Sequence, residues 1–206
     1  MTILGRPREF DRERALEAAM MVFWRKGFLG SSMNDLCDAM GIRSPSLYAA
    51  FGSKEQLYVE AVELYNAAAR TLIWNRIDDG PTVRAGMKKV LYAAADVLTG
   101  GAGAPPGCLV TLAAGEDAPG AVPEIARAGR LQGMTVLREG LERAVAAGEL
   151  PRSADLDRLS RFYVGVVQGI AIQARDGASR AEMEGTADTA MVAWPPGPAA
   201  RRRKSA

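Results

Sequence analysis

Hydrogen-bond donors are concentrated between residues 32 and 54 of this 206-residue chain. Ser32, Ser46 and Tyr48 carry hydroxyls, and Arg43 and Lys54 carry positive charge. Such groups bond to phosphate oxygens, and an arginine can also take the O6 and N7 atoms of guanine in a bidentate contact. The segment therefore favours recognition of nucleic acid. For Arg43, a contact to guanine and a contact to phosphate are equally compatible with the sequence.

Small and apolar side chains accompany these donors. Pro45, Ala49 and Ala50 can pack on thymine methyl groups, and Ser44 can bond weakly to a base edge. Because residues 49 and 50 are both alanine, we expect specificity to depend on Arg43, on thymine contacts and on DNA shape. The candidate DNA-binding residues are Ser32, Met33, Arg43, Ser44, Pro45, Ser46, Tyr48, Ala49 and Lys54.

Two short helices joined by a tight turn are predicted to position these side chains. Apolar residues recur at helical spacing through the first helix: Met33, Leu36, Cys37 and Met40. Ser31 or Ser32 can cap that helix and Gly41 can end it. Ser44 is predicted to cap the second helix, with Pro45 at its first position. This is the spacing of a helix-turn-helix, although an ordinary helical hairpin is the alternative.

The flanking helices are predicted to hold this hairpin rigidly. Asp11 begins a helix that runs to about Lys26, and Ser53 caps a long helix that continues to about Ile77. The three N-terminal helices share a predicted apolar centre of Leu16, Met20, Phe23, Leu36, Met40, Leu47 and Phe51. Apolar residues predicted on the inner face of the long helix include Leu57, Ala61, Leu64, Ala68, Leu72 and Trp74.

The remainder of the chain also has helical periodicity, and no strand pattern is found. Helices are predicted over residues 82–98, 108–114, 124–147, 153–175 and 179–193. The fold class is therefore all-α, with a helix-turn-helix domain over 1–52 and a larger ligand-binding and dimerisation domain over 53–194. Residues 195–206 are expected to be a disordered basic tail, and disorder is expected from Trp194 onward. Arg6 and Arg8 lie on an N-terminal arm that could follow phosphates or remain a solvated terminus.

The composition limits the possible classes of protein only weakly. The net charge is +2, and the chain holds two cysteines and no histidine. We expect reduced thiols and a cytoplasmic protein, because no signal peptide or membrane-length apolar run is found. No catalytic motif, metal-ligand spacing or cofactor loop is recognised, so no enzyme, metal or cofactor is predicted. An all-α small-molecule carrier or enzyme with a purely structural hairpin remains the alternative from another class.

A small-molecule pocket is predicted in the larger domain. The apolar, methionine-rich candidates suggest a hydrophobic or aromatic ligand, although the sequence favours the ordinary core for any one of them taken singly. They are Trp74, Met87, Leu91, Cys108, Leu112, Met134, Phe162 and Val166. Gly165 and Gly169 stand four residues apart on an apolar helix, where small residues let two helices approach closely, within one chain or across a two-fold axis.

The N-terminal third resembles the TetR family of bacterial transcription regulators. The resemblance rests on Arg6-Pro-Arg, the helix from Asp11 to Gly27, Ser31-Ser32-Met33, Gly41-Ile42, Pro45-Ser-Leu-Tyr-Ala-Ala-Phe51 and Ser53-Lys-Glu-Gln-Leu57. Pro106-Gly-Cys-Leu109 and Gly169-Ile-Ala-Ile-Gln-Ala174 look like a common subtype of the family's second domain.

The resemblance implies a homodimeric regulator, most often a repressor, that binds a near-palindromic operator on double-stranded DNA. A small effector of unknown identity would release it by moving the helix that begins near Lys54; an activator is the alternative. The family forms its dimer through the last two helices. This places the interface on residues 156–175 and 182–193, including Gly165, Gly169, Ile172, Gln173 and Met183.

Overall fold

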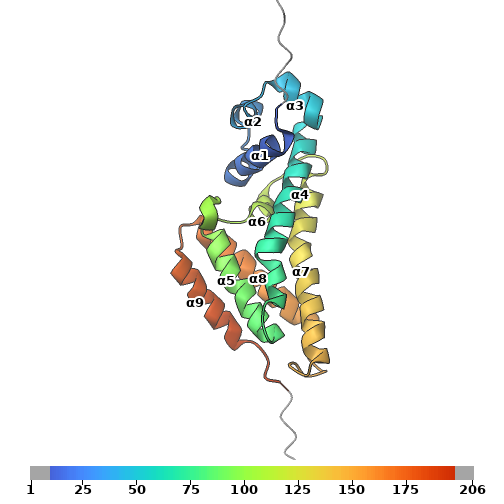
Figure 1. Cartoon of the computed structure of the whole chain (residues 1–206), viewed down its shortest axis with the longest axis vertical. Helices are drawn as coiled ribbons and strands as arrows, with labels where there is room; N and C mark the ends of the chain where they lie inside the picture. The colour runs from blue at the N-terminus through green and yellow to red at the C-terminus, as the bar shows by residue number, and fades with distance from the viewer. Residues whose placement is uncertain (1–9, 198–206) are drawn as a thin grey trace, which may run out of the picture.

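Two groups of helices follow one another along the long axis of the molecule and are joined by α4 (Figure 1). The computed structural model describes residues 10–197, in which every regular element is helical. The smaller group, called the head, consists of α1 (Arg12–Lys26), α2 (Met33–Met40) and α3 (Ser44–Phe51). The all-α fold class with an N-terminal three-helix unit is confirmed. Arg6, Arg8 and residues 198–206 lie outside the described residues.

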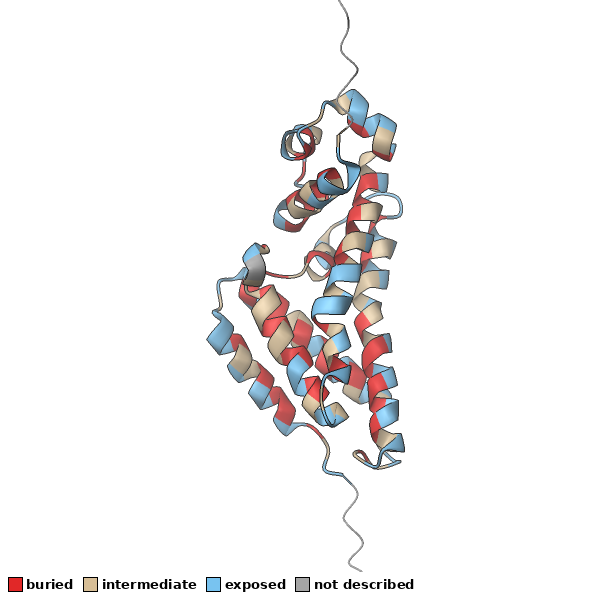
Figure 2. Cartoon of the chain, viewed as in Figure 1, coloured by how far each residue is buried: buried red, intermediate tan, exposed pale blue. Residues whose placement is uncertain are grey.

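The larger group is built around four long helices. Its elements are α5 (Val83–Leu98), α6 (Leu109–Leu112), α7 (Val122–Ala146), α8 (Leu156–Arg175) and α9 (Arg180–Val192), with 3-10 turns η1 (Trp74–Asp78), η2 (Gly101–Gly103) and η3 (Ala113–Gly115). Helix α5 packs against α8 and α9, while α7 packs against α4 and α8. Buried residues line the inner sides of these helices (Figure 2), where their apolar side chains form one continuous core.

Helix caps fix where the head elements begin. Asp11 accepts hydrogen bonds from the amides of Glu13 and Arg14, and Ser32 forms a reciprocal capping box with Asp35. The predicted core is correct for Phe23, Leu36, Met40, Leu47 and Phe51, all of which are buried. Leu16 and Met20 are only partly buried, because Ala15 and Ala19 occupy the closest contact along α1.

Helix α4 (Lys54–Leu72) is shorter than predicted. Ser53 caps it as expected, but the chain changes to the 3-10 turn η1 before Ile77. Ala68 and Leu72, predicted to face inward, are exposed. The reason is that α4 buries its aromatic side: Tyr58 packs edge-on against Phe23 and Phe28, and Tyr65 packs edge-on against Trp24.

Two further boundaries differ from the sequence-based expectation. The segment predicted as one helix over 108–114 is a single α-helical turn followed by η3. Trp194, expected to lie in a disordered tail, is 7% exposed and packs on Tyr163 with ring centroids 6.0 Å apart. An indole buries a large apolar area wherever the core offers a contact, so the folded domain continues past α9.

Candidate nucleic-acid interface and effector cavity

Helix α3 presents one face to solvent and one to the head core. Leu47 and Phe51 are buried, whereas Pro45, Ser46 and Ala49 are exposed and Tyr48 is 50% exposed. Large apolar anchors on one side hold the helix, and they leave the small and hydroxyl-bearing side chains free for a partner. The predicted separation is observed for these residues, but Ala50, predicted to face DNA, is half-buried against the head core.

The start of α3 differs from the prediction. Arg43, which is exposed, occupies the N-cap position without a side-chain capping bond, so Ser44 is the first helical residue and Pro45 the second. The Ser44 hydroxyl lies 3.5 Å from the Cys37 thiol instead of capping the helix. The prediction of Ser44 as the cap was wrong, because its side chain points toward α2. Arg43, at the exposed tip of the turn, keeps its guanidinium available.

The other candidate contacts lie at the edges of the head. Ser32 is exposed, and its hydroxyl donates to Asp35 at 2.8 Å. Met33 is half-buried against the head core. The Lys54 ammonium lies 4.3 Å above the Phe28 ring, and partial burial there lowers the pKa of Lys54. Lys54 is also the first residue of α4, and the free backbone amides at this helix N-terminus favour an anion.

Hydrogen bonds tie the head to the larger domain beside α4. The Trp24 indole donates to the Gly107 carbonyl at 3.2 Å, and Arg175 donates to the Arg25 carbonyl at 2.6 Å. The Phe28 amide donates to Glu116 Oε2 at 2.9 Å. Sequence patterns do not predict these contacts, since the partners are separated by 83, 150 and 88 residues respectively.

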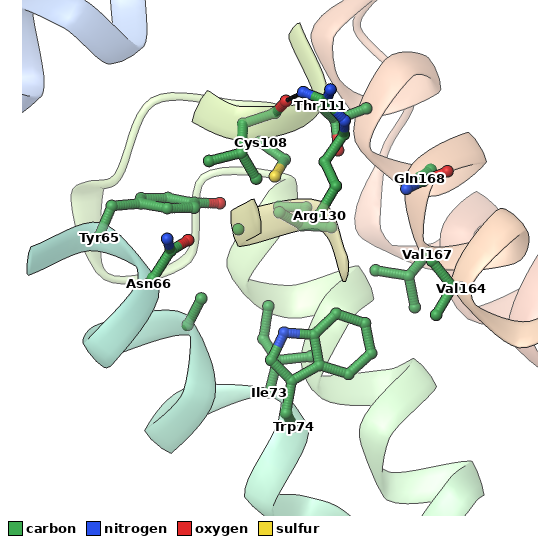
Figure 3. A pocket seen from close by; sticks show the side chains of 14 residues that line it. Tyr65, Asn66, Ile73, Trp74, Cys108, Thr111, Arg130, Val164, Val167 and Gln168 are labelled. Atoms are coloured by element: carbon green, nitrogen blue, oxygen red, sulfur yellow. Dashed lines mark hydrogen bonds between the residues drawn. The ribbon is translucent and has the colours of Figure 1, made fainter. Parts of the chain in front are cut away.

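A small apolar cavity lies in the larger domain where α4, α6, α7 and α8 meet (Figure 3). Its lining residues are Tyr65, Asn66, Ala69, Ile73, Trp74, Leu98, Cys108, Val110, Thr111, Gly129, Arg130, Val164, Val167 and Gln168. The volume is about 40 Å³, enough for a few waters but not for an organic molecule. A ligand larger than this must separate the walls.

The predicted pocket residues are only partly brought together by the fold. Trp74 and Cys108 line the cavity. Met87 and Leu91 are fully buried core residues, while Val166 is half-buried against that core. Leu112 and Met134 line other surface depressions, and Phe162 is 41% exposed. Sequence reasoning missed Tyr65, Asn66 and Arg130, because polar residues within otherwise amphipathic helices give no signal of a shared cavity.

Helix α7 approaches α4 closely at the cavity through two glycines. A Cβ at Gly129 would lie 2.7 Å from Asn66 Oδ1, and one at Gly133 would lie 2.5 Å from the Trp74 ring. Both glycines thus allow side chains of the α4–η1 segment to lie directly on the α7 backbone. Burial raises the pKa of Tyr65, whose hydroxyl lies beside Cys108. The wall formed by α4 is therefore tightly packed.

The predicted dimer residues occupy the outer face of α8, with one exception. A Cβ at Gly165 or Gly169 would meet no atom within 4 Å, and Ile172 and Gln173 are exposed. Met183 is 2% exposed within its own chain, because it faces the core from α9. Its inclusion was wrong: the hydrophobic periodicity of α9 selects the side that packs inside the protomer.

Within the described residues, no group of histidine, cysteine, aspartate and glutamate side chains is arranged to hold a metal ion, and no helix has the length and apolarity needed to cross a bilayer.

Two family models together match most of the chain. Residues 15–61 match the bacterial regulatory proteins of the tetR family, and residues 86–190 match the tetracyclin repressor-like C-terminal domain. The chain belongs to the TetR family. Like other members, it is a DNA-binding transcriptional regulator, and α2 and α3 are its helix-turn-helix.

Relatives extend this membership over nearly the full length. The transcriptional repressor ComR of Escherichia coli is 30% identical over 194 residues, which cover 93% of this chain and 92% of that protein. A cysteine mutant of the TetR-family regulator CifR, solved with 26-base-pair operator DNA, superimposes with a TM-score of 0.87 and 38% identity over 92% of this chain and 100% of that one. The E. coli repressor BdcR is 48% identical over 61 residues, 30% of this chain and 31% of that protein.

Proposed function

We propose that this TetR-family protein is a homodimeric repressor whose two α3 helices enter successive major grooves of a near-palindromic operator. The observation that carries the proposal is the exposed face of α3, held by buried Leu47 and Phe51 and flanked by Arg43 and Lys54. Tyr48 provides a hydroxyl for a phosphate, and Pro45 and Ala49 provide apolar contacts for thymine, whereas the Ser32 hydroxyl already donates its hydrogen to Asp35. The likeness to a CifR variant bound to operator DNA supports this use of the head.

The dimer would form through the outer faces of α8 and α9. Phe162 and Ile172 are large apolar residues that a single chain leaves 41% and 44% exposed. Beside them, the open space at Gly165 and Gly169 would let the backbone of a second α8 approach closely. A two-fold axis there would hold two heads at the separation of successive grooves, about 34–36 Å.

Release from DNA would follow effector binding in this small cavity. Helix α4 supplies Tyr65 and Asn66 to one wall, and its first residue, Lys54, directly follows the head and lies over the Phe28 ring. A ligand can shift an equilibrium only by its differential affinity for the two states. Because the cavity must widen to admit an effector, a bound effector would favour a displaced α4 and therefore a changed spacing between the heads.

Selection of DNA tests the DNA-binding part directly. The full-length chain would be used to capture duplexes from a random-sequence library, and the affinity for the selected duplex and a scrambled duplex would be measured at several salt concentrations. We expect an inverted-repeat consensus and a steep fall of affinity with salt, because phosphate contacts release counterions. Failure to enrich any sequence would contradict a sequence-specific regulator, and enrichment of one half-site would contradict the dimer.

A further inference from the structure

The charged residues that line the cavity and the groove beside it all have the same sign. Among the cavity-lining residues, Arg130 on α7 is the charged one. An adjoining surface groove of about 250 Å³ between α7 and α8 shares Arg130, Val164 and Gln168 with the cavity. Arg127 and Arg161 line this groove as well, and none of the described residues lining either space is acidic. Groove and cavity thus form an apolar recess beneath a cationic rim.

These arginines retain donors for a ligand. Arg130 donates from Nη1 to the Val110 carbonyl at 2.6 Å, as Figure 3 shows, but a guanidinium has five N–H donors. Arg127 pairs with Glu124 at 3.0 Å. Arg161 is exposed and forms no ion pair with any residue in the described range 10–197. Arg130 and Arg161 are therefore available to an anion that enters from the groove.

The cavity itself favours an apolar body. Trp74, Ile73 and Val167 contribute indole and aliphatic surface. Apart from Arg130, the polar lining groups are the amides of Asn66 and Gln168, the hydroxyls of Tyr65 and Thr111 and the thiol of Cys108. A cationic ligand would meet only like charge at the rim, whereas a carboxylate can accept two parallel hydrogen bonds from a guanidinium. Recess and rim together match a molecule with one apolar part and one negative end.

We propose that the effector is an apolar carboxylic acid, whose alkyl or aryl part enters the cavity beside Trp74 and whose carboxylate binds Arg130 and Arg161. The inference rests on the proposed effector-released repressor and names the chemical class of its ligand. Since the empty cavity holds only about 40 Å³, the acid inserts as α4 and α7 separate. Arg130 couples binding of the acid to the movement of these helices, because its hydrogen bond to the Val110 carbonyl connects α7 with α6. Helix α6 is the turn that leads to Glu116.

The test compares acids with uncharged compounds of the same shape. Octanoate, decanoate, 3-phenylpropanoate and 4-phenylbutanoate would each be titrated against the corresponding amide, using calorimetry on the full-length protein. We expect at least one acid to bind about tenfold or more tighter than its amide. The preference should fall to about twofold or less in Arg130→Gln and be partly restored in Arg130→Lys, because a point charge replaces the bidentate fork. Arg161→Gln should lower it to an intermediate value.

Arg152→Gln is the matched control, since it removes the same charge from an exposed loop and should keep the full preference. Each variant must be fully folded at the titration temperature, as its melting curve shows, and must retain the wild-type affinity for the selected operator without ligand. Equal binding of acid and amide in every pair, or binding of none of the acids at millimolar concentration, would overturn the inference. If the unliganded wild-type protein did not bind the operator, the proposed function would be overturned instead, whichever acid binds.

Discussion

Glu116 and Phe28 form a direct link between the two domains: the Phe28 amide donates to the Glu116 carboxylate at 2.9 Å. Gly27, the residue before Phe28, has a φ of +72°, and a Cβ there would lie 1.8 Å from Glu116 Oε1. The glycine therefore serves both the positive φ of the turn after α1 and the close approach of the carboxylate. Because Glu116 follows η3 directly, this bond connects the end of the cavity-lining segment with the head.

Loss of this link should loosen the head. Glu116→Ala leaves the part-buried Phe28 amide without its acceptor, so we expect stability to fall by about 1–3 kcal/mol. Unfolding in urea, followed by tryptophan fluorescence, measures the change, and hydrogen exchange at Phe28 should increase. Asp117→Asn, at the exposed neighbouring position, is the control. Wild-type stability in Glu116→Ala would show that this hydrogen bond does not contribute to the free energy of unfolding.

Arg43→Ala distinguishes a contact of Arg43 to guanine from a contact to phosphate. If Arg43 reads guanine, the variant should lose about 1–3 kcal/mol on the operator and little on scrambled DNA. Its exposed N-cap position without a capping bond means that the substitution should leave head stability nearly unchanged. Electrophoretic mobility shifts on both duplexes measure the difference. Equal loss on both duplexes would assign Arg43 to phosphate.

Lys54→Gln should reduce the salt dependence of DNA binding. Each phosphate contact contributes about 0.9 to the slope of log affinity against log salt. One lost contact in each half of a dimer should therefore lower the slope by about 1.8. Fluorescence anisotropy over a salt series gives the slope. Lys89→Gln on α5, in the larger domain, is the control and should leave it unchanged. An unchanged slope in Lys54→Gln would exclude Lys54 from the phosphate contacts.

Gly169→Leu tests the interface on α8. Within one protomer a Cβ added at this position meets no atom within 4 Å, and leucine favours a helix more than glycine does, so the protomer should fold normally. A second α8 packed there would collide with it, and light scattering should then report monomers. Ala128→Leu adds bulk to an exposed position on α7 and should remain dimeric. A dimeric Gly169→Leu protein would remove this part of α8 from the interface.

Asp35 should contribute to stability in a pH-dependent manner. Its ion pair with Lys26 at 2.5 Å, followed by its bonds to Ser32, lowers the pKa of Asp35 below the unfolded value of about 3.9. The contribution is thus complete above the unfolded pKa and disappears as the pH falls through the folded pKa. Asp35→Asn should be less stable than wild type at pH near 7, and the two should converge in acid. Urea unfolding across this range measures the difference, and a pH-independent difference would contradict the assignment.

Local signals in the sequence were sufficient to predict the helices of the head. Capping residues, the terminating Gly41 and the apolar spacing of α2 act within a few positions of one another, so they specify helices without the rest of the fold. The same locality explains the capping box of Ser179 and Glu182, which begins α9. The predicted cap at Ser44 was wrong because the Ser44 hydroxyl instead contacts Cys37 on the neighbouring helix α2.

The sequence by itself determined an all-α chain, a helix-turn-helix with its presented face, and a family with a known architecture. Only the tertiary structure decided that Met183 faces inward, that Phe162 remains at the surface, and that Arg130 meets Trp74 at one cavity. The physical reason is the distance along the chain over which each kind of interaction acts. Helix formation and capping depend on neighbours within a turn or two, whereas cavities and interdomain bonds such as Arg175 with Arg25 depend on how whole helices pack across 150 residues of chain.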